Sequence, residues 1–185
     1  MRRDLRTAFT PADKPRNERP TVNQRRAVEV DGFALFGEAL AVCTAGGSNA
    51  NDRTAVRFYN AATLEFAAKD GHPSSGVFRV QPARPPLLYE KLEWRPISSN
   101  TLVPLGGRRF LVVVATSGGD APYPSRTRAF LTDGSQGVNY RRGTWHQPVL
   151  TLGVPTDFVM LGRTNPERDC DVAPLLGKIK MRVVV

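Results

Sequence analysis

The sequence predicts a mostly β fold, a sandwich or barrel built from many short strands. Short runs rich in β-branched and aromatic residues recur at roughly regular spacing from residue 55 onward, with turn-forming residues between them. Long stretches with helical periodicity are absent. The 16 glycines and 15 prolines suit a chain that turns often.

The chain divides into an arm and a single domain. Residues 1–27 are polar, broken by prolines, and carry a net charge of +5 out of the +9 of the whole chain. This composition predicts a flexible basic arm. Residues 28–185 are enough for one domain with a real core. Because this domain is only mildly basic and a basic arm supplies no base readout, we expect no specific nucleic-acid role.

The predicted strands follow one another closely along the domain. Residues 110–115 are continuously apolar, which predicts a central strand buried on both faces. Residues 178–185 alternate, with Ile179, Met181, Val183 and Val185 on one face, as in a half-buried strand. In chain order the predicted strands are residues 55–60, 76–81, 87–94, 101–105, 109–116, 127–132, 137–141, 149–152, 157–161 and 178–185.

Between the strands, two features can be placed. Residues 61–68 could form a short helix. Gly106-Gly107 and Asp133-Gly134 are typical of hairpin turns between paired strands.

The cellular location is predicted from what the chain lacks. Cys43 and Cys170 are not in a CxxC pattern, which favours reduced thiols in the cytoplasm. No stretch approaches the ~20 apolar residues of a membrane span, and the N-terminus has no apolar signal region. We therefore expect a cytoplasmic protein without a membrane anchor.

Histidine is scarce, which limits the chemistry. His72 lies in a turn-like Asp-Gly-His-Pro context and is expected to be solvated. His146 comes after Trp145 among aromatic, amide and guanidinium groups, so it is a candidate acid or base near neutral pH, or simply a histidine that satisfies a strand end. Two histidines fall short of a usual catalytic metal site, so we expect no metal and no other cofactor; one histidine with carboxylates remains an alternative ligand set.

Arginines supply candidate receptors for a small carboxylate. Most of them should occupy outward, solvated positions, because charged side chains rarely bury without a partner. Glu93 alternates with apolar neighbours and is either an exposed strand residue or an inward carboxylate beside an arginine. The arginines in or beside predicted strands are Arg79, Arg84, Arg95, Arg128, Arg141 and Arg142.

Two segments resemble ureidoglycolate lyases. The segment Thr127-Arg-Ala-Phe-Leu-Thr-Asp-Gly-Ser-Gln-Gly-Val-Asn-Tyr-Arg-Arg-Gly-Thr-Trp-His-Gln-Pro148 is similar to a family pattern in which Arg-Ala-Phe leads to Gly-Gln-Gly-Val-Asn-Tyr and then Trp-His-x-Pro. Residues 92–105 resemble the family's Leu-Glu-Arg-His-Pro segment and its later Ser-Gln-x-Phe-(Ile/Val)-Pro. The match covers roughly residues 33–172 and is specific because the pieces occur together.

The resemblance implies a fold and an activity. The fold is a cupin-like β-barrel (a double-stranded β-helix), usually a homodimer. The activity is that of a carbon–nitrogen lyase, which cleaves ureidoglycolate to glyoxylate and urea in allantoin (purine) catabolism. In this retro-addition a base takes the hydroxyl proton and an acid protonates the departing nitrogen.

For this activity we expect roles for individual residues, at positions that match the family pattern and at some that depart from it. His146 would be the general base or acid, Glu93 would orient it or an arginine, and Arg95 with Arg79 would bind the carboxylate. The family pattern usually has His where this chain has Arg95 and Gln where it has Asn100; arginine cannot act as a base near neutral pH but can bind a carboxylate. The other residues implied to bind substrate are Asn100, Asn139, Tyr140 and Trp145.

Two alternatives stay open at this point. In the first, the barrel is kept as a non-catalytic module that binds a small carboxylate through Arg95. In the second, the arm of residues 1–27 tethers the protein to nucleic acid or an acidic partner.

Overall fold

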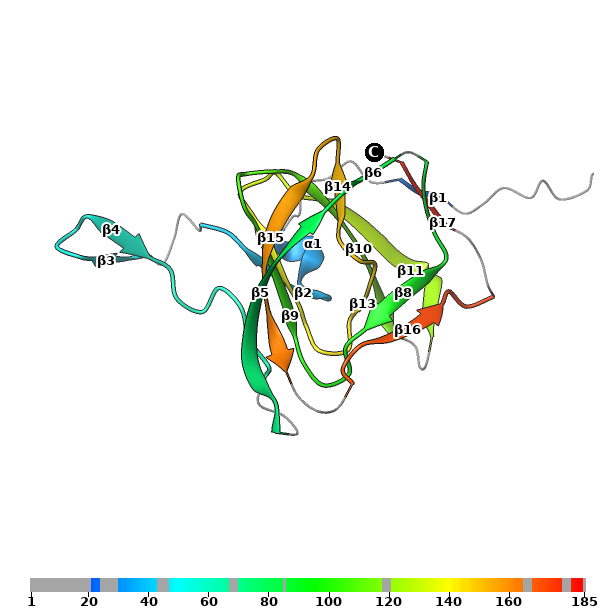
Figure 1. The fold of residues 1–185 in the computed structure, drawn as a ribbon, viewed down its shortest axis with the longest axis horizontal. Helices are drawn as coiled ribbons and strands as arrows, with labels where there is room; N and C mark the ends of the chain where they lie inside the picture. Colours follow the sequence, from blue (N-terminus) through cyan, green and yellow to red (C-terminus); the bar gives the residue numbers. More distant parts are fainter. Residues whose placement is uncertain are drawn as a thin grey trace, which may run out of the picture.

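The computed structural model describes residues 21–23, 30–42, 47–66, 70–84, 86–117, 121–164, 168–177 and 181–184. Within these ranges the regular structure is β apart from one four-residue helix, α1 (Val30–Phe33), which confirms the mostly β prediction (Figure 1). No helix in this part of the chain has the length and apolar character needed to span a bilayer.

The strands succeed one another with short connections. Their bounds are β1 (Thr21–Asn23), β2 (Gly37–Leu40), β3 (Ser48–Ala50), β4 (Ala55–Arg57), β5 (His72–Val80), β6 (Pro82–Ala83), β7 (Leu87–Tyr89), β8 (Lys91–Trp94), β9 (Asn100–Pro104), β10 (Phe110–Ser117), β11 (Pro122–Leu131), β12 (Gly137–Tyr140), β13 (Trp145–His146), β14 (Leu150–Leu152), β15 (Thr156–Thr164), β16 (Asp171–Pro174) and β17 (Met181–Val184).

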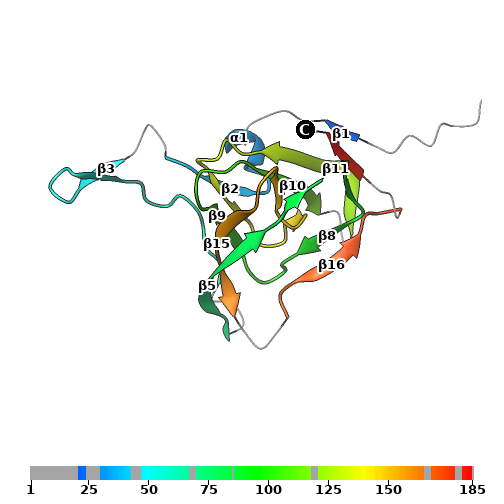
Figure 2. The same ribbon diagram turned by 45° about the horizontal axis from the view of Figure 1, so that its top comes forward.

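Two large sheets enclose the interior of the domain. One is five-stranded and antiparallel, in the order β2-β12-β9-β15-β5. The other is seven-stranded, in the order β16-β8-β13-β10-β14-β6, with β11 paired to β10. A third sheet, β1-β17-β7, lies beside the seven-stranded one (Figures 1 and 2). In the described part of the chain, the two large sheets face each other across an interior to which both contribute side chains.

Strand β10 is the central element that the sequence predicts. Residues 110–115 are all at most 1% exposed. Phe110, Val112 and Val114 face one hydrophobic cluster, and their neighbours along the strand face another. Full burial of one such side chain is worth about 1.5–3 kcal/mol, so β10 ties the two clusters into one folding unit.

One of these clusters fills the interior of the barrel. Phe33, at the end of α1, meets Phe130 edge to face at 5.5 Å, and Phe36 packs beside both. Gly37 then starts β2, and a Cβ built there would lie 1.8 Å from the carbonyl oxygen of Asn139. Only glycine lets β2 come this close to β12, the strand that carries Tyr140.

The second cluster lies on the outer face of the seven-stranded sheet. It contains Trp145, Leu175, Met181 and Val183, and it is covered by the three-stranded sheet. Met181 and Val183 are buried and Arg182 is exposed, which confirms the predicted alternation over these three residues; Ile179 and Val185 lie outside the described residues.

The predicted helix over residues 61–68 is wrong for the part that the structure describes. Residues 61–66 are irregular because their backbone groups bond to distant residues. The amide of Glu65 donates to Ser99 Oγ at 2.9 Å, and its carbonyl accepts the amide of Ser99 at 3.2 Å. These bonds use groups that a helix would need for its own i to i−4 ladder.

The two predicted hairpin turns are also wrong. Gly106-Gly107 joins β9 to β10, and Asp133-Gly134 joins β11 to β12, and in both cases the two strands belong to different sheets. Gly106, Gly107 and Gly134 all have positive φ, which turns the chain sharply from one sheet to the other. A Cβ on Gly134 would lie 2.5 Å from the carbonyl oxygen of Gly107, so the two turns pack on each other.

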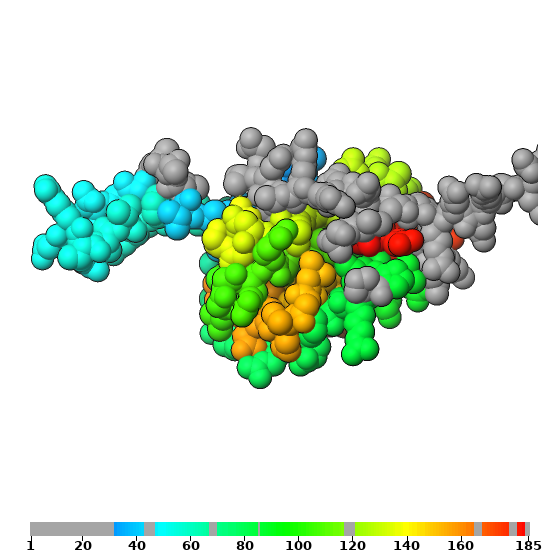
Figure 3. All heavy atoms as spheres, turned by 90° about the horizontal axis from the view of Figure 1, so that it is seen from above, coloured from blue at the N-terminus to red at the C-terminus, as the bar shows by residue number. Residues whose placement is uncertain are grey.

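Two segments stand at the margins of the domain. Residues 21–23, which the sequence assigns to the arm, form β1 and pair in parallel with β17; the rest of the predicted arm lies outside the described residues, as does Cys43. The hairpin β3-β4 projects away from the barrel in all three views (Figures 1 to 3).

Candidate active site

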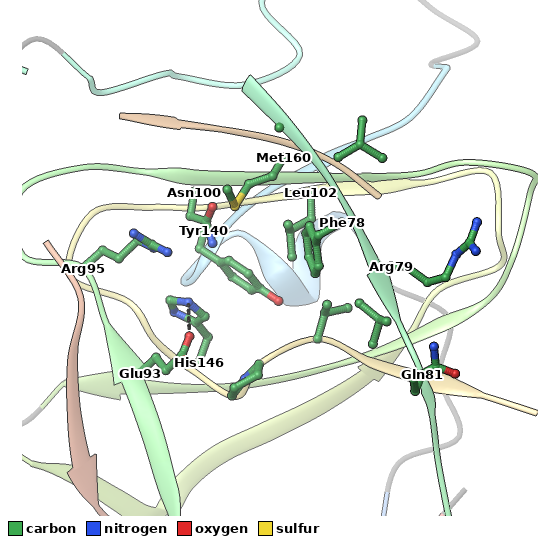
Figure 4. Close-up of a pocket in the computed structure, with 15 residues that line it drawn as sticks. Phe78, Arg79, Gln81, Glu93, Arg95, Asn100, Leu102, Tyr140, His146 and Met160 are labelled. Atoms are coloured by element: carbon green, nitrogen blue, oxygen red, sulfur yellow. Dashed lines mark ion pairs between the residues drawn. The ribbon is translucent and has the colours of Figure 1, made fainter. Parts of the chain in front are cut away.

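A pocket of about 500 Å³ lies between the two large sheets (Figure 4). It is lined from one side by β5, β9, β12 and β15 and from the other by β8 and the segment 146–149. Six of the eight site residues that the sequence predicts are among its lining residues: Arg79, Glu93, Arg95, Asn100, Tyr140 and His146.

Strands β8 and β13 carry the carboxylate and the imidazole that line the pocket, Glu93 and His146. His146 and Glu93 are directly opposite each other in the antiparallel pair, so their side chains leave the same face. His146 Nε2 lies 4.0 Å from Glu93 Oε2. The next residues along, Trp94 and Trp145, stack on the reverse face with ring centroids 5.3 Å apart. Because side chains alternate along a strand, this pair of strands has a polar face toward the pocket and an aromatic face toward the outer cluster.

The tautomer of His146 is set by its partner. The ring is 2% exposed, and Nδ1 lies 2.9 Å from the carbonyl oxygen of Thr144. A carbonyl only accepts hydrogen bonds, so Nδ1 carries the proton and Nε2 keeps a free lone pair. Nε2 is buried and has no hydrogen-bond partner among the described residues. Burial lowers the pKa of His146 to about 4, so the ring is neutral near pH 7.

Glu93 and Tyr140 complete the surroundings of this imidazole. Burial raises the pKa of Glu93, and the charge of Arg95 partly offsets that rise. The ring of Tyr140, which comes from the opposite sheet, stacks on His146 at 4.3 Å with planes 13° apart. Its hydroxyl is buried without a hydrogen-bond partner in the described part of the chain, and burial raises its pKa. The hydroxyl therefore remains protonated and can donate a hydrogen bond.

Arg95 brings the positive charge. It comes directly after β8, and its guanidinium enters the pocket beside Asn100 and Glu93 (Figure 4). Arg95 Nη1 donates to the carbonyl oxygen of Asp169 at 3.1 Å, while its buried Nε has no partner among the described residues. A guanidinium with unused donors is a ready receptor for a carboxylate.

Asp169 holds the two loops behind Arg95 together. Its carboxylate accepts the amide of Ile97 at 2.9 Å and the hydroxyl of Ser98 at 2.5 Å. The residue is 8% exposed, so these charge-assisted bonds are shielded from water. Asp169 thus fixes the segment between Arg95 and Asn100, although it does not line the pocket itself.

Two residues predicted to bind substrate point elsewhere. Asn139 lies on the face of β12 opposite Tyr140, where it bonds to Thr101, Glu38 and the carbonyl of Thr63. Trp145 faces the outer cluster behind His146. In both cases a strand turns neighbouring side chains to opposite faces, so one member of each pair is excluded from the pocket.

Arg79 lines the edge of the pocket but is not directed at its centre. It sits on an outward position of β5, with 67% of its side chain exposed, and binds Asp157 through two bonds of 2.7 and 2.9 Å. Hydrogen bonds from Arg79 lower the pKa of Asp157, as expected for a close surface pair. The predicted carboxylate-binding role of Arg79 is therefore not supported by its placement.

The sequence did not indicate the apolar part of the pocket or Asp169. Phe78 and Val80 alternate with Arg79 along β5, and this alternation was the one signal that could have placed them inside. Nothing near Asp169 in the sequence signals its contacts with residues 95–98. His72, by contrast, is exposed as predicted, though it opens β5 and is not in a loop.

The pocket offers a poor donor set for a metal ion. His146 and Glu93 supply one imidazole nitrogen and one carboxylate, and no group of three His, Cys, Asp or Glu side chains in the described ranges is placed to hold a metal. Catalytic zinc sites normally use three protein ligands. The residues of the pocket can accept a proton at His146 Nε2, bind an anion at Arg95, and donate a hydrogen bond from Tyr140.

The family model and the related proteins that match this sequence carry the same description. A family model described as ureidoglycolate lyase matches residues 21–182. Ureidoglycolate lyase from Burkholderia cepacia is 39% identical over 146 residues, covering 78% of this chain and 81% of that protein. The protein of the same name from Pseudomonas fluorescens strain Pf0-1 is 37% identical over 141 residues, covering 76% and 84%.

Solved structures are more distant. RmlC from Streptococcus suis in complex with dTDP-D-xylose aligns with a TM-score of 0.37 and 14% identity, covering 52% of this chain and 45% of that one. Bacillus subtilis oxalate decarboxylase aligns with a TM-score of 0.38 and 18% identity, covering 56% and 24%.

Proposed function

This chain belongs to the ureidoglycolate lyase family, and on that premise we propose that its pocket cleaves ureidoglycolate to glyoxylate and urea. The enzyme is then a carbon–nitrogen lyase of allantoin catabolism. The family assignment favours this activity over a non-catalytic carboxylate-binding module on the same barrel.

The proposed chemistry centres on His146. Its neutral Nε2 takes the proton from the hydroxyl group of the substrate, the oxygen forms the carbonyl of glyoxylate, and the bond from carbon to nitrogen breaks. The imidazolium then gives the same proton to the departing ureido nitrogen, so no proton is consumed overall. The carboxylate of Glu93, 4.0 Å away, stabilises the transient imidazolium charge.

The remaining groups would orient the substrate. Arg95 would bind the substrate carboxylate through the donors that its own contacts leave unused. Asn100 and the Tyr140 hydroxyl would hold the ureido group by hydrogen bonds, because both lie at the pocket surface on the sheet that faces His146. Fixed donors in a buried site act on the transition state without a cost of reorganisation.

A single observation carries this assignment. A buried histidine has one ring nitrogen held by a backbone carbonyl and the other directed, unpaired, into a cavity beside a guanidinium. The ring nitrogens of a buried histidine with a purely structural role normally both have hydrogen-bond partners. An unsatisfied Nε2 at this place is what a general base requires before its substrate arrives.

The test is a pair of matched histidine variants. His146→Gln removes the base, and we expect glyoxylate and urea release to fall by about 10²–10⁴. His72→Gln changes the other histidine of the chain, which is exposed and outside the pocket, and should leave the rate unchanged. Circular dichroism checks the fold of both. Equal turnover in His146→Gln and the parent enzyme would refute the role of His146.

We also propose that the enzyme works as a homodimer in the cytoplasm. The hairpin β3-β4 projects from the barrel (Figure 3), and Val56 and Tyr59 near its base are 57% and 66% exposed. A lone two-stranded hairpin is marginally stable in water, so a surface on a second copy would support it. Val56→Asp should convert a dimer to a monomer in light scattering; a parent protein that is monomeric at tens of micromolar would contradict the proposal.

A further inference from the structure

The pocket has two chemically different ends. Glu93, Arg95, Asn100 and His146 form the polar end, as Figure 4 shows. The apolar end is formed by the lining residues Phe78, Val80, Leu102 and Val149. The ring of Tyr140 lies between the two ends, and its hydroxyl is directed toward the apolar one (Figure 4).

The cavity is larger than ureidoglycolate requires. That molecule has nine non-hydrogen atoms, and if each took as much space as a liquid water molecule, the whole would fill at most about 270 Å³. The cavity measures about 500 Å³. A ureidoglycolate molecule bound at the polar end therefore leaves the apolar end vacant.

The apolar end is well formed and uncharged. Phe78 stacks on Phe158 with ring centroids 5.7 Å apart, and Leu102 is 3% exposed. Arg79 lies on the same side of the pocket in Figure 4, but its guanidinium points away and is paired with Asp157. An apolar wall with few polar groups at one end is the usual composition of a site that binds an organic substituent.

We propose that the apolar end is a subsite for an alkyl or aryl group on the ureido nitrogen of the substrate, so that the enzyme takes N-substituted ureidoglycolates. This inference rests on the proposed function. With the carboxylate at Arg95 and the reacting carbon at His146, the ureido carbonyl meets the Tyr140 hydroxyl. The distal nitrogen, and any group attached to it, then extends into the apolar end.

The reaction of such a substrate balances without another reactant. The bond from the hydroxyl-bearing carbon to the proximal nitrogen breaks, and that carbon becomes the aldehyde of glyoxylate. The hydroxyl proton passes through His146 to the proximal nitrogen, and the second product is the N-substituted urea. The substituent itself takes no part in bond breaking and contributes through binding.

Stable analogues separate binding from turnover. Hydantoate is ureidoglycolate without its hydroxyl group, so it cannot be cleaved by this route. We expect calorimetry on the full chain to show that N-butylhydantoate, substituted at the distal nitrogen, binds about tenfold more tightly than hydantoate, which is about 1.4 kcal/mol. A full butyl group buried in the subsite would give more, so this figure assumes partial burial.

Variants locate the effect. Val80→Thr makes the apolar end polar at similar volume, and Val80→Phe fills it from β5, where Val80 lies on the same face as Phe78. Either change should bring the ratio of the two dissociation constants close to one. Val159→Thr is the matched control, because Val159 neighbours Met160 on β15 but is not a lining residue. It should leave the ratio at about ten.

The outcomes distinguish the two proposals. Equal or weaker binding of N-butylhydantoate to the parent enzyme would overturn the subsite, as would a tenfold preference that both pocket variants retain. Glyoxylate release from ureidoglycolate and from its N-butyl derivative is measured in parallel. Preferential binding without any glyoxylate release would refute the lyase activity and leave the subsite standing; release from ureidoglycolate alone would do the reverse.

Discussion

At the scale of the residue, burial gives His146 an unusual acid strength. The buried ring loses the hydration that stabilises its charged form, and the positive charge of nearby Arg95 lowers its pKa further. The Thr144 carbonyl, which accepts the Nδ1 proton, opposes it but does not restore an ordinary pKa. Burial is therefore the main reason why His146 stays neutral well below pH 7.

This pKa predicts the pH profile of the enzyme. A general base works in its deprotonated form, and with a pKa of about 4 His146 is deprotonated at all higher pH values. We expect kcat/KM to be level with respect to this group from pH 5.5 to 8 and to decline as the pH falls through about 4. A decline centred near pH 6.5 in initial-rate measurements, the value of a solvated histidine, would contradict the buried, neutral state.

Arg95 predicts a different kinetic signature. Arg95→Gln removes the charged donors for the substrate carboxylate, a contact worth about 1.5–3 kcal/mol, so KM should rise about 10- to 100-fold. The effect on kcat should be smaller, because the carboxylate is bound in both the ground state and the transition state. Arg128→Gln, at an exposed arginine outside the pocket, is the control. A fall in kcat with KM unchanged would assign Arg95 to the chemical step.

The sequence placed the polar centre of the site but not its boundaries. Glu93, Arg95 and His146 were predicted from a motif, and they meet because β8 pairs with β13. Asn139 and Trp145 were predicted from the same motif and lie on the wrong faces. Residues that are neighbours in a sequence motif point to opposite faces when the motif forms a strand. Which of the two faces the pocket depends on the register of that strand in the sheet.

At the scale of the element, the segment that carries Arg95 depends on one carboxylate. Asp169 binds Ile97 and Ser98 through its side chain and Arg95 through its carbonyl, so two loops move as one. Residues in loops are normally the more mobile part of a fold. Here the buried bonds hold a loop residue at a defined place in the pocket.

Asp169 is therefore expected to act as a positioning residue. Asp169→Asn loses a charged acceptor, and its amide NH₂ would face a donor, so Arg95 should lose its fixed position. We expect KM to rise about tenfold with a smaller change in kcat, together with a lower melting temperature. Asp171→Asn, two residues along and 54% exposed on its side chain, is the matched control. Unchanged KM in the Asp169 variant would disprove the positioning role.

Strands and turns were predicted correctly where neighbouring residues in the sequence determine them. The run of residues 110–115 is apolar on both faces, which is typical of a strand buried in the middle of a sheet. The turns at Gly106-Gly107 and Asp133-Gly134 were predicted as hairpins because glycine indicates a turn but not which strands will pair. The backbone of Glu65 was predicted as helical because its bonds to Ser99 span 34 residues and leave no local trace.

At the scale of the whole molecule, the third sheet connects the start of the chain to its end. Strand β1 pairs in parallel with β17, and β17 pairs with β7 over the outer cluster. This sheet covers the reverse side of the strands that carry His146 and Glu93. Strands β8 and β13 thus have the pocket on their inner face and the three-stranded sheet on their outer face.

The pairing of β1 predicts a boundary for truncation. A chain that begins at residue 25 lacks β1 and leaves an edge of β17 unpaired, so its melting temperature should be several degrees lower than that of a chain that begins at residue 21. Calorimetry on the two chains measures this difference. Identical melting curves would mean that β1 contributes nothing to the stability of the domain.

The stacked indoles behind the pocket make the site observable in a simple way. The chain has two tryptophans, Trp94 and Trp145, each one residue from Glu93 or His146 on the same strands. Intrinsic fluorescence excited at the indole band therefore originates from the back wall of the site and from nowhere else in the chain. A ligand titration could be followed optically in the unlabelled protein, through shifts in emission that a remote part of the fold cannot produce.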